Sequence, residues 1–163
     1  MTKAKRQMIE SAKKVDGVLE VLDSRIPYSS RNPDFDNIFA NKKRLIILNK
    51  SDLADGIINL WKDYYKSKGI DTVEVCATRK NDKAKLIQFI KKSLEDKIQH
   101  NKKRGIKKVI KLMIVGIPNS GKSTVINLLA NQVSAKTGNI PGVTRGQQMI
   151  RVTEDIVLLD TPG

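Results

Sequence analysis

Short continuous apolar runs alternate along the chain with segments whose apolar residues recur every three or four positions. A short, mostly continuous apolar run of about four to six residues is typical of a strand buried on both faces of a sheet. Such runs occupy residues 17–22, 44–48, 72–77, 111–115 and 156–159. We therefore expect several short, largely parallel strands.

The segments between the runs have helical spacing, which places apolar side chains on one face of each predicted helix. These side chains are Ala4, Met8, Ala12 and Val15; Ile57, Leu60, Trp61 and Tyr64; Leu86, Ile87, Ile90, Leu94 and Ile98; and a run over 125–130. Strands that alternate with helices predict an α/β fold, with a mostly parallel sheet of about six strands covered by helices on both faces. Ligands of such folds bind at the carboxyl ends of the strands.

The length of 163 residues predicts one domain, over residues 1–163. The single cysteine, Cys76, excludes an intrachain disulfide and a multi-cysteine zinc site, so we expect no disulfide-linked partner. No apolar run is long enough to span a bilayer. We expect a cytoplasmic monomer without a membrane partner.

The charge balance changes this picture. Lys and Arg number 31 against 17 Asp and Glu, which gives a net charge of +14. Such a surplus favours a polyanionic partner such as RNA, although a generally basic surface is the simpler alternative. Residues 97–111 hold seven cations and no acidic residue. This stretch is either a solvated helix end or a contact for phosphates, and its His100 is expected to be exposed and non-catalytic.

Residues 116–123, GIPNSGKS, fit the pattern G-x-x-x-x-G-K-[ST] between a predicted strand and a predicted helix. Backbone N–H groups of such a loop surround phosphates, Lys122 reaches the outer phosphates, and the Ser123 hydroxyl binds Mg²⁺. The predicted phosphate-binding residues are Gly116, Pro118, Asn119, Ser120, Gly121, Lys122, Ser123 and Thr124.

Asn49-Lys50-Ser51-Asp52 follows another predicted strand at the same edge of the sheet. The Asp52 carboxylate can accept hydrogen bonds from N1–H and the 2-amino group of guanine together, which adenine cannot supply. Lys50 would lie across the base, and Asn49 would tie this loop to the phosphate loop. Alone, these residues would more simply be a polar loop. A backbone N–H of Cys76 or Ala77 could reach the guanine oxygen.

Two further motifs complete the candidate site. Residues 160–163 fit D-x-x-G, in which Asp160 supports Mg²⁺ and the Gly163 amide meets a γ-phosphate. Thr144 could complete the Mg²⁺ shell when a triphosphate is bound. The metal ligands are therefore predicted to be Ser123, Thr144 and Asp160, and the catalytic groups Lys122, Thr144 and Gly163.

The order of the motifs resembles that of the circularly permuted GTPases, because residues 49–52 precede the phosphate loop. The segment DSRIP at 23–27, followed by SSRN at 29–32, is similar to the loop of the YlqF/RbgA ribosome-biogenesis group. The resemblance implies a permuted P-loop GTPase fold, GTP and GDP with Mg²⁺, and K⁺ near Asn119. It also implies action in maturation of the large ribosomal subunit, with rRNA and ribosomal proteins as partners.

The family normally has a leader ending in Gly-His and a helical C-terminal domain, and we expect this chain to be a fragment without them. GTP hydrolysis by the fragment is then expected to be slow. One alternative is a guanine-nucleotide-regulated module that binds RNA or the ribosome with little hydrolysis of its own. A third hypothesis, an ATPase, predicts that Asp52→Asn leaves the nucleotide preference unchanged.

Overall fold

A six-stranded sheet forms the centre of the computed structural model, which describes residues 3–25, 33–50, 56–106, 108–116, 120–130 and 148–160. The strand order is β3-β2-β1-β4-β6-β5, and only β5 is antiparallel to its neighbour. The strands are β1 (Gly17–Asp23), β2 (Lys43–Asn49), β3 (Asp71–Glu74), β4 (Ile110–Val115), β5 (Gln148–Arg151) and β6 (Ile156–Asp160).

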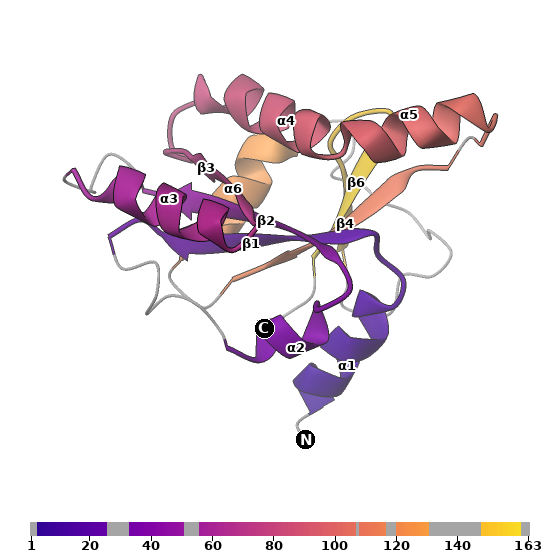
Figure 1. Ribbon diagram of the computed structural model, residues 1–163, viewed down its shortest axis with the longest axis horizontal. Helices are drawn as coiled ribbons and strands as arrows, with labels where there is room; N and C mark the ends of the chain where they lie inside the picture. Colours follow the sequence, from indigo (N-terminus) through magenta and orange to yellow (C-terminus); the bar gives the residue numbers. More distant parts are fainter. Residues whose placement is uncertain are drawn as a thin grey trace.

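Helices cover both faces of this sheet, as the sequence predicts (Figure 1). One face packs against α1 (Lys3–Ala12), α2 (Asp34–Ile38) and α3 (Ile58–Ser67). The other packs against α4 (Asp82–Ser93), α5 (Glu95–Lys103) and α6 (Lys122–Leu129). None of these described helices is long and apolar enough to cross a membrane.

The two packed faces explain why the central strands are apolar at nearly every position. In β1, Leu19 and Val21 belong to the core under α4 and α6, whereas Val18 and Leu22 face the opposite helices. Side chains of a strand alternate between faces, so a strand with two covered faces needs apolar residues at consecutive positions. The mostly parallel α/β fold is therefore confirmed.

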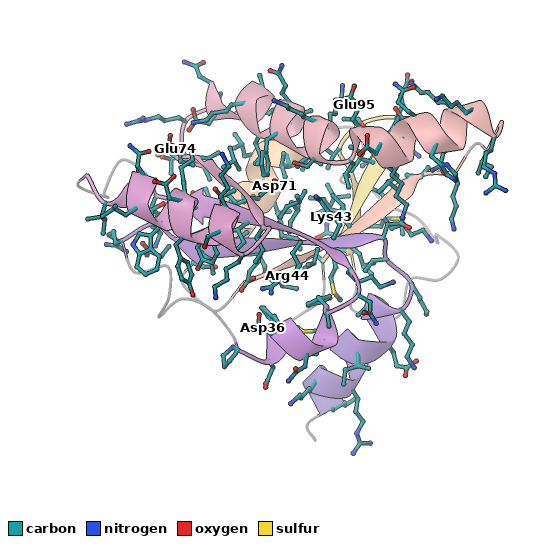
Figure 2. The ribbon with its side chains drawn as sticks, viewed as in Figure 1. Asp36, Lys43, Arg44, Asp71, Glu74 and Glu95 are labelled. Carbon is teal, nitrogen blue, oxygen red and sulfur yellow. The ribbon has the colours of Figure 1, made fainter. Side chains whose placement is uncertain are left out.

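A buried ion-pair network interrupts this apolar arrangement at Glu20 of β1. Glu20 is 1% exposed, and its Oε2 accepts a hydrogen bond of 2.6 Å from Nη2 of Arg44 in β2. Nη1 of Arg44 donates to Oδ1 of Asp36 at 2.7 Å, so that the guanidinium links the sheet to α2 (Figure 2). These two carboxylates raise the pKa of Arg44 above its ordinary value, although burial opposes the shift.

Several local predictions are wrong in detail. The helix predicted through Ile98 is two helices, which meet at Leu94. In α3 the buried residue is Tyr65, four positions after the partly buried Trp61, while Leu60 is 69% exposed. The strand predicted over 72–77 ends at Glu74. Val15 is buried beyond the end of α1, and neither the short α2 nor β5 was located from the apolar pattern.

The order of the strands reverses direction at β1. The chain passes from β1 outward to β2 and β3, and then returns to β4 on the other side of β1. At such a reversal, the loops that follow the two central strands turn away from each other and leave room for a ligand at their carboxyl ends. The loop after β4 begins at Gly116, one residue past the end of the strand.

Candidate functional site

The five parallel strands, β1, β2, β3, β4 and β6, end at the same edge of the sheet. Side-chain contacts connect residues that follow several of these strands. Of the predicted site residues, the structure describes Asn49, Lys50, Cys76, Ala77, Gly116, Ser120, Gly121, Lys122, Ser123, Thr124 and Asp160. Five others lie outside the described residues: Asp52, Pro118, Asn119, Thr144 and Gly163.

The start of α6 has the backbone of an anion-binding turn. Gly121 precedes the helix with a φ of +91°, a left-handed conformation that favours glycine. A Cβ on Gly121 would collide with Nδ2 of Asn49, and one on Gly116 would lie 2.7 Å from Oγ of Ser120. The first N–H groups of α6 have no acceptor within the helix, and they can therefore bind an anion. Ser123, in this first turn, is exposed.

Asn49 connects three parts of the site. It is 1% exposed at the end of β2, and its Nδ2 donates to the Ser120 carbonyl at 3.2 Å. Its Oδ1 accepts a hydrogen bond of 3.1 Å from the Ala77 N–H after β3. The side-chain amide thus joins the ends of β2 and β3 to the turn that follows β4, as expected for Asn49.

Lys122 and Asp160 also lie together. The Lys122 ammonium is 3.1 Å from Oδ1 of Asp160, which ends β6, and the two side chains are 19% and 22% exposed. The first residue of α6 is therefore close to a carboxylate from the neighbouring strand. This arrangement places a cation for phosphates beside an oxygen ligand suited to Mg²⁺.

Lys50 is held by a carboxylate that sequence reasoning left without a role. The backbone of Lys50 is left-handed, with a φ of 59°, and its Nζ lies 3.4 Å from Oδ2 of Asp23. Asp23 also accepts from Nη2 of Arg25 at 2.7 Å and from Nε at 3.0 Å. The Arg25 guanidinium, with a smaller contribution from Lys50, lowers the pKa of Asp23 to about 2. The available sequence signals were a carboxylate at the end of an apolar strand and its place at the start of the segment DSRIP at 23–27.

The backbone amides of Cys76 and Ala77 already have partners within the protein. The Cys76 N–H donates to Oδ2 of Asp82 at 2.7 Å, and the Ala77 N–H donates to Asn49. Either amide would have to share its hydrogen to contact a guanine oxygen. The contact of one of these amides with a guanine oxygen stays a prediction. Asp82, which accepts this hydrogen bond, carried no signal in the sequence beyond its place at the start of a helix.

A buried hydroxyl supports a ligand at the turn. Oγ of Ser120 is buried and has no hydrogen-bond partner among the described residues. A buried polar group without a partner costs about 1–3 kcal/mol, so a ligand that supplied one would be favoured. Together with the glycine turn, the start of α6 and Lys122, this hydroxyl fits an anionic ligand such as a polyphosphate.

Known proteins with similar sequences share a common description. A family model described as a 50S ribosome-binding GTPase matches residues 111–163. The chain is 47% identical to "Ribosome biogenesis GTPase A" of Priestia megaterium, across 100% of this chain and 58% of that protein. It is 37% identical to "Mitochondrial ribosome-associated GTPase 1" of Mus musculus, across 100% and 52%. The chain thus spans a little over half the length of these curated relatives.

Solved structures with a similar fold include proteins bound to guanine nucleotides. The chain matches the GNP-bound YlqF from T. maritima with a TM-score of 0.67 and 28% identity, across 99% of this chain and 58% of that one. A GDP-bound structure of the same protein matches with a TM-score of 0.65. YjeQ from Thermotoga maritima, at 19% identity and a TM-score of 0.53, shares the fold.

Proposed function

We infer that this chain belongs to the circularly permuted GTPases of the YlqF/RbgA type, and we propose that it binds and hydrolyses GTP in assembly of the large ribosomal subunit. Residues 1–163 would form one GTPase domain. The observation that carries the proposal is Asn49, whose two hydrogen bonds join the base-side segment to the phosphate-side turn. A nucleotide bound across this edge of the sheet would contact both segments, with its base beside one and its phosphates beside the other.

Each residue of the site has a role in this proposal. Asp52 would accept the guanine N1–H and amino group, with Lys50 across the base and the Cys76-Ala77 turn beside it. The phosphates would lie on the backbone N–H groups of residues 116–124, Asn119 included, with Lys122 on the outer phosphates. Pro118 has no N–H and would only shape the loop. K⁺ near Asn119 would add positive charge there.

Mg²⁺ would be held by Ser123, Thr144 and Asp160 together with phosphate oxygens and water. No group of three His, Cys, Asp or Glu side chains that could hold a metal is found in the described part of the chain. Mg²⁺ commonly takes most of its ligands from substrate phosphates and water. The metal would neutralise charge on the β- and γ-phosphates, with the Gly163 amide on the γ-phosphate.

The proposed reaction is attack of water on the γ-phosphorus, with cleavage of the bond to the β-phosphate oxygen, which yields GDP and phosphate. Positioning and charge neutralisation by Lys122, Thr144 and Mg²⁺ would supply the catalysis. The names of the relatives support a ribosomal subunit as the partner. In a bacterium, this work would take place in the cytoplasm.

The test is calorimetric titration with GDP, a non-hydrolysable GTP analogue and ADP, in potassium buffer with Mg²⁺. We expect binding of the guanine nucleotides only. Asp52→Asn should remove that preference, whereas Asp63→Asn, on the exposed side of α3, should not. Failure of the folded chain to bind GDP would reject the proposal. Phosphate release, with and without large ribosomal subunits, separates a GTPase from a nucleotide-regulated binding module.

A further inference from the structure

The helix α5 lies at the opposite end of β4 from the candidate nucleotide site. α4 and α5 run end to end along one face of the sheet, and α5 extends to the amino end of β4 (Figure 1). Ile98 and Lys102 of α5 line a cavity with Ile110, the first residue of β4, and Asp155 before β6. β4 ends at Val115, directly before the phosphate loop. Six residues of strand separate the two regions by about 20 Å.

Two contacts hold α5 in this position, although the helix has no fully buried residue. Ile98 packs against the main core, and Nζ of Lys97 donates to Oδ1 of Asp16 at 2.7 Å. Oδ2 of Asp16 accepts from the Lys111 N–H at 2.9 Å. Burial raises the pKa of Asp16, but the hydrogen bonds from Lys97 and Lys111 outweigh it, so that Asp16 stays charged. Lys97 therefore serves as an anchor.

The other cations of this region point away from the core. Nitrogen-tipped side chains extend outward from α4 and α5 (Figure 2). Six exposed residues make no ion pair with another described residue, and we call them the α5 surface: Lys91, Lys92, Lys102, Lys103, Arg104 and Lys108. Lys102 lines two adjoining hollows of about 340 and 450 Å³. Glu95, Glu154 and Asp155 line them too, yet the cations outnumber these acids.

We propose that the α5 surface binds RNA through its phosphates. Six exposed cations lie close together in sequence, two at the end of α4, two in α5 and two just beyond it, and none forms an ion pair with another described residue. This excess is more than solubility requires, and the RNA backbone, a chain of phosphates, complements it. Phe89 is partly buried against the core, and residues 82–110 contain no Trp or Tyr. Contacts to phosphates are therefore expected to dominate, and such contacts carry no sequence information.

The position of the α5 surface means that RNA and nucleotide can be bound together. That the RNA would be ribosomal RNA rests on the proposed function, whereas the binding of RNA itself does not. RNA binding itself is tested separately from nucleotide binding, so either proposal can fail alone.

The test is the fluorescence anisotropy of a labelled hairpin RNA with the whole chain, in rising KCl and saturating GDP. The variant is Lys102→Gln with Lys103→Gln and Arg104→Gln. Its matched control is Lys3→Gln with Lys66→Gln and Lys68→Gln, which removes the same charge from exposed positions on α1 and at the end of α3. Glutamine preserves helix propensity, and Lys97 is left in place to hold α5.

We expect the variant to lose at least about tenfold in RNA affinity at low salt and to reduce the slope of log K against log[KCl] by about 2. The control should keep the slope of the unchanged chain, and both should bind GDP normally. Equal losses in variant and control would overturn the proposal, as would the absence of RNA binding by the unchanged chain. Binding of a polyglutamate peptide as tight as that of RNA would also overturn it, because it would indicate an acidic protein partner.

Discussion

Nδ2 of Asn49 donates a hydrogen bond to the carbonyl of Ser120, 71 positions later in the chain. Both groups are buried, and the same side chain accepts from Ala77. The two halves of the candidate site are therefore joined directly by one amide. Any change to Asn49 should alter both halves at once.

Asn49→Ala leaves the Ser120 carbonyl and the Ala77 N–H without their partner. We expect the free energy of unfolding to fall by about 3 kcal/mol, since a buried unsatisfied group costs about 1–3 kcal/mol. GDP affinity should fall by more than tenfold. Urea denaturation and calorimetry measure the two effects. Asn41→Ala, at an exposed turn, is the control, and an equal loss of affinity there would contradict the assigned role.

Gly121→Ala tests the turn before α6. A left-handed backbone costs a non-glycine residue about 1–2 kcal/mol, and here the new methyl group would also strike Asn49. Gly69→Ala is the matched control, because Gly69 has a similar left-handed φ of +75° and a Cβ there meets nothing within 4 Å. Both variants should lose stability in thermal denaturation, but only Gly121→Ala should lose GDP binding. Normal nucleotide binding by Gly121→Ala would show that the turn is not part of the site.

The Asp23 carboxylate should make the free energy of unfolding depend on pH in the acidic range. Its pKa is about 2 in the folded chain, below the ordinary 3.8, so its charged form stabilises the fold above the ordinary pKa. That contribution, about 2 kcal/mol from the shift, should disappear as the pH falls from about 4 to 2. Denaturation of the unchanged chain and of Asp23→Asn across this range isolates it. A stability difference that stayed constant down to pH 2 would contradict the prediction.

Glu20 and Arg44 should show strong non-additivity. Glu20→Leu leaves the guanidinium of Arg44 buried with Asp36 alone, at a cost of about 2–4 kcal/mol. Replacing both residues by leucine removes the uncompensated charge, so the double variant should be more stable than Glu20→Leu. A double-mutant cycle by urea denaturation measures the coupling. Additive losses would mean that the pair contributes no net interaction energy.

Most of the fold was predictable because a covered strand needs apolar residues on both faces. Four strands, β1, β2, β4 and β6, have this signature, and β3 was located by apolar residues that continue past its end. β5 is an edge strand in which Met149 and Ile150 are buried between exposed Gln148 and Arg151. A segment of four residues with this pattern is too short to show the spacing of apolar residues that identifies a strand. The break between α4 and α5 was equally hidden, because Leu94 and Ile98 continue the apolar spacing across it.

The candidate site was predictable only as far as its motifs reach. The contact between Asn49 and the phosphate-side turn follows from motif spacing and the edge that two strands share. The pairing of Lys50 with Asp23 does not, because it depends on the left-handed backbone of Lys50 and on the register that sets Asp23 beside Asn49. The use of the Ala77 amide by Asn49 likewise depends on tertiary structure.

The central place of β1 determines the order in which the site can be assembled during translation. A growing chain presents β1, β2 and β3 first, and these strands pair with one another without any later segment. Asn49 and Ala77 can therefore meet while β4 is still inside the ribosomal tunnel. The turn at Ser120 arrives only afterwards, when β4 pairs with the free side of β1. Asp160 follows later still, when β6 pairs with β4. The proposed nucleotide site is therefore incomplete in a nascent chain until both strands have joined the sheet.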